Sequence, residues 1–252
     1  MELNAIYTIW LREIKRFQRD KARIIGNLAT PIIWLAIGGV GLSSTFSLPD
    51  TSYLSFVTPG IIGMSLLFTS IFAGISVIAD KQFGFLKEIL VAPVSRTSII
   101  LGKIAGSSTV SVANGILILI IAILFGIFPF SSLNILYLVS TILFMILTST
   151  SIVSLGLIIA SKLNSMEGFQ LIMSFLVIPL FLLSGAFFPL QNVPSWMRML
   201  AFFDPLMYGV DGMRASLINL SQLPILSDLA VLTVFCIIVI FISSFMFRRI
   251  GE

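Results

Sequence analysis

The sequence predicts an all-α integral membrane protein with six transmembrane helices. Only 10% of its 252 residues are charged and 58% are hydrophobic, whereas soluble domains carry roughly 25% charged residues. Six apolar stretches reach or approach the ~20 residues that a helix needs to cross a bilayer. Their length favours helices over a β-barrel, whose strands need only ~10 residues. The predicted spans are residues 24–46, 53–79, 104–128, 135–160, 169–188 and 229–247.

The distribution of basic residues predicts the topology. If the N-terminus lies inside, the inside segments hold six Lys and Arg before residue 24, four between residues 80 and 103, Lys162, Arg248 and Arg249. Only Arg198 and Arg214 then lie outside. The positive-inside rule therefore places both termini in the cytoplasm of a multi-pass protein of the cell membrane. This arrangement by membrane side does not suggest nucleic acid as a partner.

Residues 1–23 read as an amphipathic helix that precedes the first span. Apolar residues recur at helical spacing at Leu3, Ile6, Trp10, Ile14 and Phe17. The opposite face carries Arg12, Lys15, Arg16 and Arg19. We expect this helix to lie in the headgroup layer with its basic face toward lipid phosphates or a partner. A signal for topology alone is the other interpretation, and the two are compatible.

The stretch between the second and third spans, residues 80–103, carries six charged residues. Residues 80–91 can form a short helix with one apolar face of Phe83, Leu86 and Leu90. Pro93 ends that helix because it lacks an N–H group. Ser95 or Thr97 can then cap the next helix. A short helix, a proline break and a new helix make a shape suited to docking a partner, although an ordinary solvated loop is also compatible.

The segment between the fifth and sixth spans, residues 189–228, is apolar although it is predicted to face outside. Pro194 can open one short helix, and Asp204 with Pro205 reads as the N-cap and first residue of another. Two short apolar helices predict a re-entrant hairpin in the outer leaflet. Asp211 and Arg214 stand three residues apart, so their side chains can meet on one helix face. Arg214 could equally reach Asp211 of a second copy, or an acidic group on a cargo.

Two polar or small-residue patterns have more than one interpretation. Gly102 and Gly106 form a small-xxx-small pair that lets another helix approach closely. The pair alone is weak evidence for a seam between two copies. Hydroxyl-rich stretches at residues 107–114 and 148–154 could line a polar route. More often such hydroxyls bond to helix backbone.

The charged stretch and the outer segment together resemble a known family. Glu88 and Leu90 before Ala92-Pro93, then Ser95-Arg96 and Gly102-Lys103, are similar to the central loop of type-2 ABC transporter permeases. The resemblance continues through SGAFFP at residues 184–189, VPxW at 193–196 and DPLMYGVDGMR at 204–214. It extends over nearly the whole chain, in the family's order, and so implies one permease domain, residues 1–252.

The resemblance implies roles for particular residues. Residues 1–23 would be a connecting helix, and residues 80–98 a coupling loop that inserts into a separate ATP-binding subunit. The implied coupling residues are Phe83, Gly84, Leu86, Glu88, Leu90, Pro93 and Arg96. The hairpin at residues 189–228 would form a lid near the substrate exit. The implied lid residues are Ser184, Gly185, Pro189, Asp204, Pro205, Tyr208, Asp211 and Arg214.

The function that follows is transport rather than catalysis. The chain has no GxxxxGK[ST] phosphate loop, so ATP and Mg²⁺ are expected on a partner subunit. The resemblance implies a permease dimer in a two-plus-two exporter of amphipathic or lipid-like compounds. An ion-coupled carrier is the alternative, disfavoured because the predicted spans contain no Asp, Glu, Lys, Arg or His. A membrane enzyme or metal site is less favoured still, since the chain has no histidine and a single cysteine, Cys236.

Overall fold

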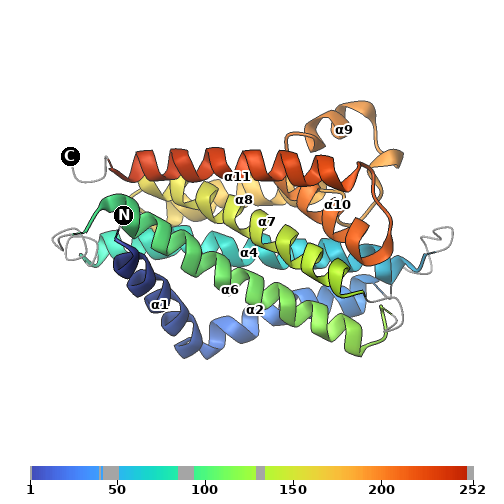
Figure 1. Cartoon of the computed structure of the whole chain (residues 1–252), viewed down its shortest axis with the longest axis horizontal. Helices are drawn as coiled ribbons and strands as arrows, with labels where there is room; N and C mark the ends of the chain where they lie inside the picture. The colour runs from blue at the N-terminus through green and yellow to red at the C-terminus, as the bar shows by residue number, and fades with distance from the viewer. Residues whose placement is uncertain (1, 40, 42–50, 85–93, 129–133, 249–252) are drawn as a thin grey trace.

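The computed structural model describes residues 2–39, 41, 51–84, 94–128 and 134–248. In these residues the regular elements are all helices, as predicted, and the long ones lie alongside one another in an elongated bundle (Figure 1). The elements are α1 (Leu3–Arg19), α2 (Lys21–Ile33), η1 (Trp34–Gly39), α4 (Tyr53–Gln82), α6 (Arg96–Leu124), α7 (Ile135–Lys162), α8 (Met166–Leu183), η3 (Leu190–Asn192), α9 (Ser195–Ala201), α10 (Pro205–Ile218) and α11 (Ile225–Arg248).

Five described helices, α4, α6, α7, α8 and α11, are long and apolar enough to cross a membrane. The protein is therefore a multi-pass membrane protein. The predicted first span, residues 24–46, is described only in part. There the 13-residue α2, which contains Pro31, continues into the π-helical η1. A proline inside a helix removes one backbone hydrogen bond and its ring crowds the preceding turn, yet α2 continues for two residues past Pro31 before the helix type changes.

The helices extend further than hydropathy predicts, and this changes the place of two charges. Asp80 was expected in the loop after the second span and at the start of a separate helix, but it lies in the last turns of α4. Lys103 was expected in the same loop, but it lies two turns inside α6. Hydropathy ends a span at a charged residue, whereas backbone hydrogen bonding continues wherever the charge finds a partner.

Side-chain caps explain where several helices begin. Ser95 was predicted as a cap, and its hydroxyl accepts a hydrogen bond from the backbone N–H of Ser98 at 3.2 Å. Asp204 caps α10 as predicted, with 2.9 Å from the N–H of Leu206 to its carboxylate. Asp20 separates α1 from α2 and accepts from the N–H of Arg23.

The helix α4 forms the centre of the bundle, and α2, α6, α7, α8 and α10 all pack against it. The helix α10 inserts among α4, α7 and α11, so its length is almost wholly buried. The short helix α9 lies at the edge of the bundle, at the end where α10 lies (Figure 1). Trp196 in α9 and Phe203 just after it are exposed. The predicted pair of short helices after α8 is present, but the two members differ in burial.

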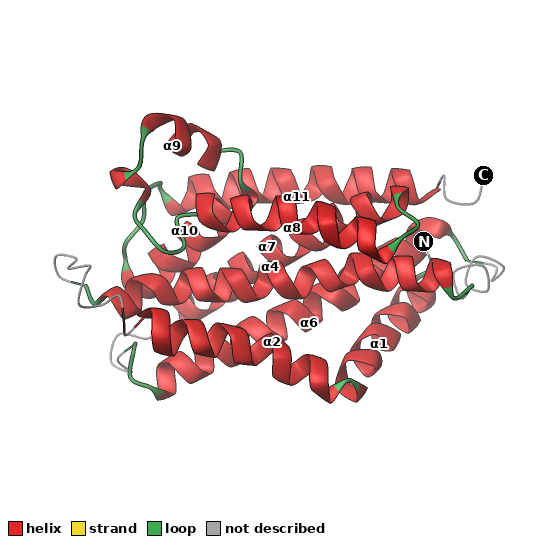
Figure 2. Cartoon of the chain, turned by 180° about the vertical axis from the view of Figure 1, so that it is seen from behind, coloured by secondary structure: helices red, strands yellow, loops and turns green. Residues whose placement is uncertain are grey.

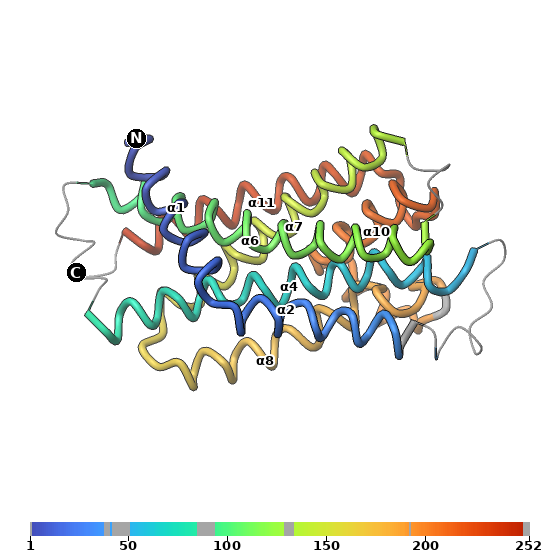
Figure 3. Tube along the Cα trace, turned by 90° about the horizontal axis from the view of Figure 1, so that it is seen from below, coloured from blue at the N-terminus to red at the C-terminus, as the bar shows by residue number. Residues whose placement is uncertain are grey.

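The bundle has two chemically different ends. We call the basic end the one at which α4 and α11 end and α6 begins, and the hairpin end the one that carries α9 (Figures 1 and 2). The helix α1 crosses the bundle obliquely at the basic end and packs chiefly against α6 (Figure 3). The sequence predicts that the basic end is the cytoplasmic one.

Candidate functional site

A buried ion pair joins α4 to α6 at the basic end. The Lys103 ammonium donates a hydrogen bond to the Asp80 carboxylate, with 2.6 Å from Nζ to Oδ2. Asp80 is 3% exposed and Lys103 is 1% exposed. Removing one partner of such a pair typically costs about 3–5 kcal/mol, because an uncompensated buried charge remains. The pair is therefore a strong constraint on how the ends of α4 and α6 sit relative to each other.

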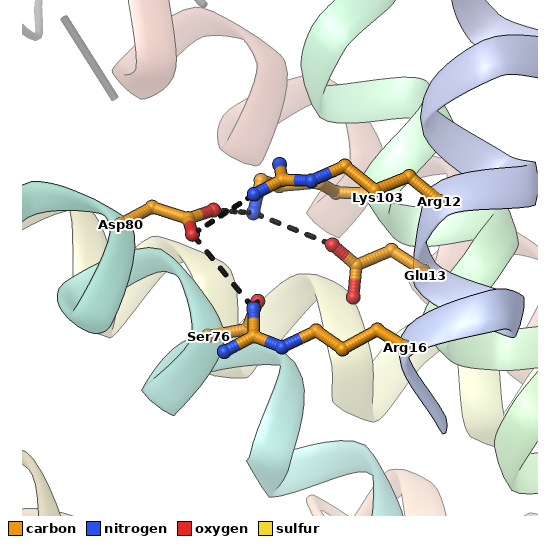
Figure 4. A network of polar contacts seen from close by, with 6 residues as sticks. All are labelled: Arg12, Glu13, Arg16, Ser76, Asp80 and Lys103. Atoms are coloured by element: carbon orange, nitrogen blue, oxygen red, sulfur yellow. Dashed lines mark hydrogen bonds and ion pairs between the residues drawn. The ribbon is translucent and has the colours of Figure 1, made fainter. Parts of the chain in front are cut away.

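Three charged residues of α1 surround this pair, which makes a cluster of five charges in all (Figure 4). Arg12 lies 3.3 Å and Arg16 3.7 Å from Asp80 Oδ1, measured from their guanidinium nitrogens. Glu13 Oε1 lies 3.6 Å from Lys103 Nζ. We call Arg12, Glu13, Arg16, Asp80 and Lys103 the ion cluster. It holds three cations and two carboxylates, and Asp80 is shared by Arg12 and Arg16 of α1 and by Lys103 of α6.

The two predicted packing glycines place α1 over α6. A Cβ atom on Gly102 would lie 2.8 Å from Ile9 Cβ, and one on Gly106 would lie 2.7 Å from Glu13 Cβ. Real Cβ atoms do not approach so closely, so only glycine admits α1 at these positions. The small-residue pair therefore seats a helix of the same chain. Trp10 secures the crossing with a hydrogen bond from Nε1 to Thr109 Oγ1 at 3.1 Å.

The predicted basic face of α1 is divided between two environments. Arg12 and Arg16 turn toward Asp80, and Arg16 also donates to Ser76 Oγ at 3.0 Å. Their side chains nevertheless remain 38% and 44% exposed, so contact of the basic face with lipid or a partner stays a prediction for all four residues. The Lys15 and Arg19 side chains are exposed. All four line a shallow basic groove of about 500 Å³ along α1.

The ion cluster lies next to the predicted coupling loop. Phe83 ends α4 and is 72% exposed, and Gly84 follows with φ of +79°. Arg96 opens α6 and donates to the backbone carbonyl of Arg248 at the end of α11. The other predicted coupling residues lie outside the described residues: Leu86, Glu88, Leu90 and Pro93.

Lys81 connects the end of α4 to the end of α7. Its ammonium donates to the carbonyls of Ala160, Ser161 and Leu163 at 3.0, 2.8 and 3.1 Å. These carbonyls lie at the C-terminus of α7, where unpaired backbone acceptors and the helix dipole favour a cation. Asp80 and Lys81 thus bind α4 to α1, α6 and α7 within two consecutive residues.

Arg214 in α10 does not pair with Asp211, contrary to the hypothesis drawn from their spacing. Its guanidinium donates to the carbonyls of Gly185 at 2.9 Å and Phe56 at 3.3 Å. The guanidinium carbon also lies 3.9 Å from the centroid of the Phe56 ring. A planar fork of donors suits two convergent carbonyls, and the ring face favours the cation. Arg214 thus joins α10 to α4 and to the turn after α8.

Asp211 faces the other way and organises the link between α10 and α11. Its carboxylate accepts from the backbone N–H groups of Gln222, at 2.9 Å, and Leu223, at 3.1 Å. Burial raises the pKa of the Asp211 carboxyl, and these two N–H groups oppose that rise. The two residues that sequence spacing suggested as a pair are therefore separate anchors.

The remaining predicted lid residues support this arrangement. Ser184 donates to the Phe181 carbonyl at 2.7 Å, and Gly185 adopts φ of +70°, which presents its carbonyl to Arg214. Tyr208 donates to the Phe202 carbonyl at 2.7 Å, holding α10 to the end of α9. Pro189 precedes η3, and Pro205 is the first residue of α10. Each residue has a structural role in the hairpin end.

Sequence reasoning missed the ion cluster because its members come from three segments. Glu13 was not singled out, and Asp80 and Lys103 were read as loop charges. One signal was available: Lys103 stands alone between Gly102 and Gly106 in an apolar run. In the part of the chain that the structure describes, no group of His, Cys, Asp and Glu could hold a metal ion.

The resemblance to a transporter family is confirmed by comparison with known proteins. The family model described as ABC-2 type transporter matches residues 4–218, which include the ion cluster and the whole of α10. The chain belongs to the ABC-2 type transporter family. The match ends at the last residue of α10, before α11 begins.

Several curated proteins are similar over most of the chain. The inner membrane transport permease YadH of Escherichia coli K12 is 28% identical over 240 residues, covering 92% of this chain and 90% of YadH. The putative transport permease ycf38 of Porphyra purpurea is 29% identical over 203 residues, covering 78% and 68%. Nodulation protein J of Rhizobium leguminosarum bv. viciae is 26% identical over 245 residues, covering 96% and 93%.

Proposed function

We propose that this chain is the membrane-spanning permease subunit of an ATP-driven exporter. Two copies would form the translocation path, and separate ATP-binding subunits would bind ATP and Mg²⁺. Family membership and relatives named transport permeases support a transport subunit. The lack of a phosphate loop in the sequence supports a separate source of energy.

The observation that carries the mechanism is the ion cluster. Residues 83–95 connect the end of α4 to the start of α6, and the Asp80–Lys103 pair joins those two helices immediately above this connection. A partner that pushes on the connection therefore displaces both helix ends. Arg12, Glu13 and Arg16 carry α1 along with them. The cluster would convert a local push into a rigid-body movement of three helices, which is a common form of switching.

At the hairpin end, Arg214 and Asp211 support a lid on the path. Arg214 holds α10 to α4 and to Gly185, so a movement of α4 reaches α10 directly. In this proposal the same helix α4 carries the signal from the basic end to the lid. The substrate class that the family resemblance supports is an amphipathic small molecule or a lipid-like compound.

An ion-coupled carrier is the second candidate. One structural observation favours it, although the sequence alone did not. The predicted spans contained no Asp, Glu, Lys, Arg or His, but the observed helices do contain such residues. Asp80 lies in α4, Lys103 lies in α6, and the fully buried Asp228 lies in α11. Proton-coupled carriers use such buried groups. Against this, the Asp80–Lys103 pair has a structural role in joining three helices.

The experiment that separates the two is transport by the purified complex in vesicles. We expect uptake of a fluorescent amphiphile into inside-out vesicles to require ATP and the co-purified ATP-binding subunit. Lys103→Met is expected to abolish ATP-dependent transport while ATP hydrolysis persists. Lys162→Met, an exposed lysine at the same end, serves as the control and is expected to behave as wild type. Transport driven by a proton gradient without the ATP-binding subunit would support the carrier instead.

A further inference from the structure

A groove of about 570 Å³ lies between α2 and α4 and is assigned no role by the proposed mechanism. The two helices run side by side in the views of Figures 2 and 3. The groove begins at the first turn of α2, at Asp20 and Arg23, and continues past Asn27. Its α4 side is formed by Ser65, Phe68 and Phe72, among others. It therefore extends from the basic end toward the middle of the bundle.

Three buried donors on the wall of this groove have no hydrogen-bond partner. They are Arg23 Nε, Asn27 Nδ2 and Ser65 Oγ. Ser65 is only 2% exposed, so bulk solvent does not supply the missing partner. An unsatisfied buried polar group is costly and uncommon in native proteins. Their common position on one groove indicates that a ligand supplies the acceptors.

Neighbouring hydroxyls on α4 show that Ser65 is an exception. The Thr58 hydroxyl donates to the Leu54 carbonyl of its own helix at 2.6 Å. The Ser70 hydroxyl is engaged with Ser111 Oγ at 3.2 Å. Ser65 lies two turns after Thr58 on the same face of α4 but makes neither kind of bond. Ser65 lines the groove together with Phe68.

The donors on the groove wall define the class of ligand. Among the described residues, no carboxylate lies within 4.0 Å of the Arg23 guanidinium, whose carbon instead lies 4.6 Å from the centroid of the Phe72 ring. Asp20 also lines the groove, with its Oδ1 engaged as the cap of α2, so the formal charges of Asp20 and Arg23 balance. It is the directed donors, a guanidinium, an amide and a hydroxyl, that suit the oxygens of a phosphate or carboxylate.

The rest of the wall is apolar. Phe68 is 42% exposed, and Met64 and Pro31 complete the surface beyond the donors. We propose that the groove between α2 and α4 binds an amphipathic anion. Its phosphate or carboxylate head would lie against Arg23, Asn27 and Ser65, and its apolar part would lie along Phe68 and Met64. This deepens the proposed function by giving the class of its cargo, and rests on that function only in calling the ligand a cargo.

The test is direct binding to the full chain, purified with its accompanying subunits in an uncharged maltoside detergent and without ATP. The probe is hexadecyl phosphate with a diazirine on its chain, and cross-linked peptides are identified by mass spectrometry. We expect labelling of peptides from α2 and α4. Unlabelled hexadecyl phosphate should compete, whereas hexadecyltrimethylammonium and inorganic phosphate should not. Competition by inorganic phosphate at similar concentration would mean a free-anion site and overturn the amphiphile assignment.

Substitutions at the donors give the sharper result. Arg23→Gln is expected to weaken probe binding by ~10-fold or more, as expected for a lost charged hydrogen bond, and Arg23→Lys should retain most of it. Ser65→Ala should also weaken binding, yet raise the melting temperature of the ligand-free protein because it removes an unsatisfied hydroxyl. If the Ser65 hydroxyl were needed only for folding, Ser65→Ala would lower the melting temperature and leave probe binding unchanged.

Two matched variants complete the test. Ser70→Ala, a buried serine of the same helix whose hydroxyl is bonded, should lower the melting temperature and leave probe binding unchanged. Arg19→Gln removes an exposed cation one turn before the groove and should leave probe binding unchanged. If Arg19→Gln weakens labelling as much as Arg23→Gln, attraction to general basic charge explains the result and the site is rejected. Because the assay uses no ATP, its failure leaves the proposed exporter function unaffected.

Discussion

Asp80 and Lys103 are 23 residues apart in the sequence, yet their side chains form a hydrogen-bonded ion pair of 2.6 Å in the interior of the basic end. The intervening residues make the connection on which a partner subunit would act. A mechanical link is therefore present between the two helices that this connection joins. Its buried position protects the pair from screening by salt, since only exposed charges are strongly screened.

Breaking the ion pair should cost more stability than replacing it. We expect Lys103→Met to lower the stability of the permease by up to about 3–5 kcal/mol, with part of that cost offset because Arg12 and Arg16 stay beside Asp80. The double variant Asp80→Leu with Lys103→Met should recover only part of the loss, since an apolar pair can substitute for the buried ion pair but Glu13 still lacks its lysine. The measurement is thermal unfolding of the purified complex.

Transport in the same double variant distinguishes a mechanical role from a structural one. We expect ATP hydrolysis without proportionate transport, because an apolar pair cannot hold Arg12, Glu13 and Arg16 of α1. Full transport by the double variant would contradict the role proposed for the ion cluster.

The crossing of α1 over α6 should be sensitive to any side chain at Gly106. Gly106→Leu would place atoms where Glu13 now lies, and overpacking of this kind typically costs about 1–3 kcal/mol. We expect α1 to be displaced and the Trp10–Thr109 hydrogen bond to be lost. The intrinsic fluorescence spectrum and the thermal stability of the purified permease measure these effects.

Gly26 in α2 is the matched control for the Gly106 variant. No heavy atom lies within 4 Å of a Cβ built there, so Gly26→Ala should be neutral or stabilise the helix by about 0.5–1 kcal/mol. Equal loss of stability in both glycine variants would show that α1 is not seated as described.

The two charged residues of α10 should act independently. Arg214→Gln is expected to lose about 1.5–3 kcal/mol for each charged hydrogen bond that it removes. Asp211→Asn should cost less, because an amide oxygen can still accept from Gln222 and Leu223. The charge-swapped double variant should be no more stable than the worse single variant. A double-mutant cycle on melting temperature tests this, and a clear rescue by the swap would indicate a direct pair.

The membrane orientation can be tested with single cysteines in a Cys236→Ser background. Asn164, between α7 and α8, lies at the basic end, and Ser221, between α10 and α11, lies at the hairpin end; both are exposed. The distribution of Lys and Arg predicts that a membrane-impermeant thiol reagent labels Ser221→Cys on intact cells and labels Asn164→Cys only after permeabilisation. The reverse pattern would invert the topology.

Several elements were predictable because their signals are local. The serine cap at Ser95 and the Asp204-Pro205 start of α10 depend on the backbone conformation of a few adjacent residues. The helices after residue 51 follow from runs of apolar residues. The ends of these helices were less predictable, because Asp80 and Lys103 look like loop residues until their partners are known.

Local sequence patterns were enough to predict the class of protein, the approximate position of most helices and the resemblance to a transporter family. Which charges meet depends on how the helices pack. Arg214 sits three residues from Asp211 but bonds to carbonyls 158 and 29 residues away, at Phe56 and Gly185. Asp80 gains partners from α1 and α6 in the same way. The physical reason is that hydropathy and capping are properties of neighbouring residues, whereas a buried charge is stabilised by whichever groups helix packing brings around it.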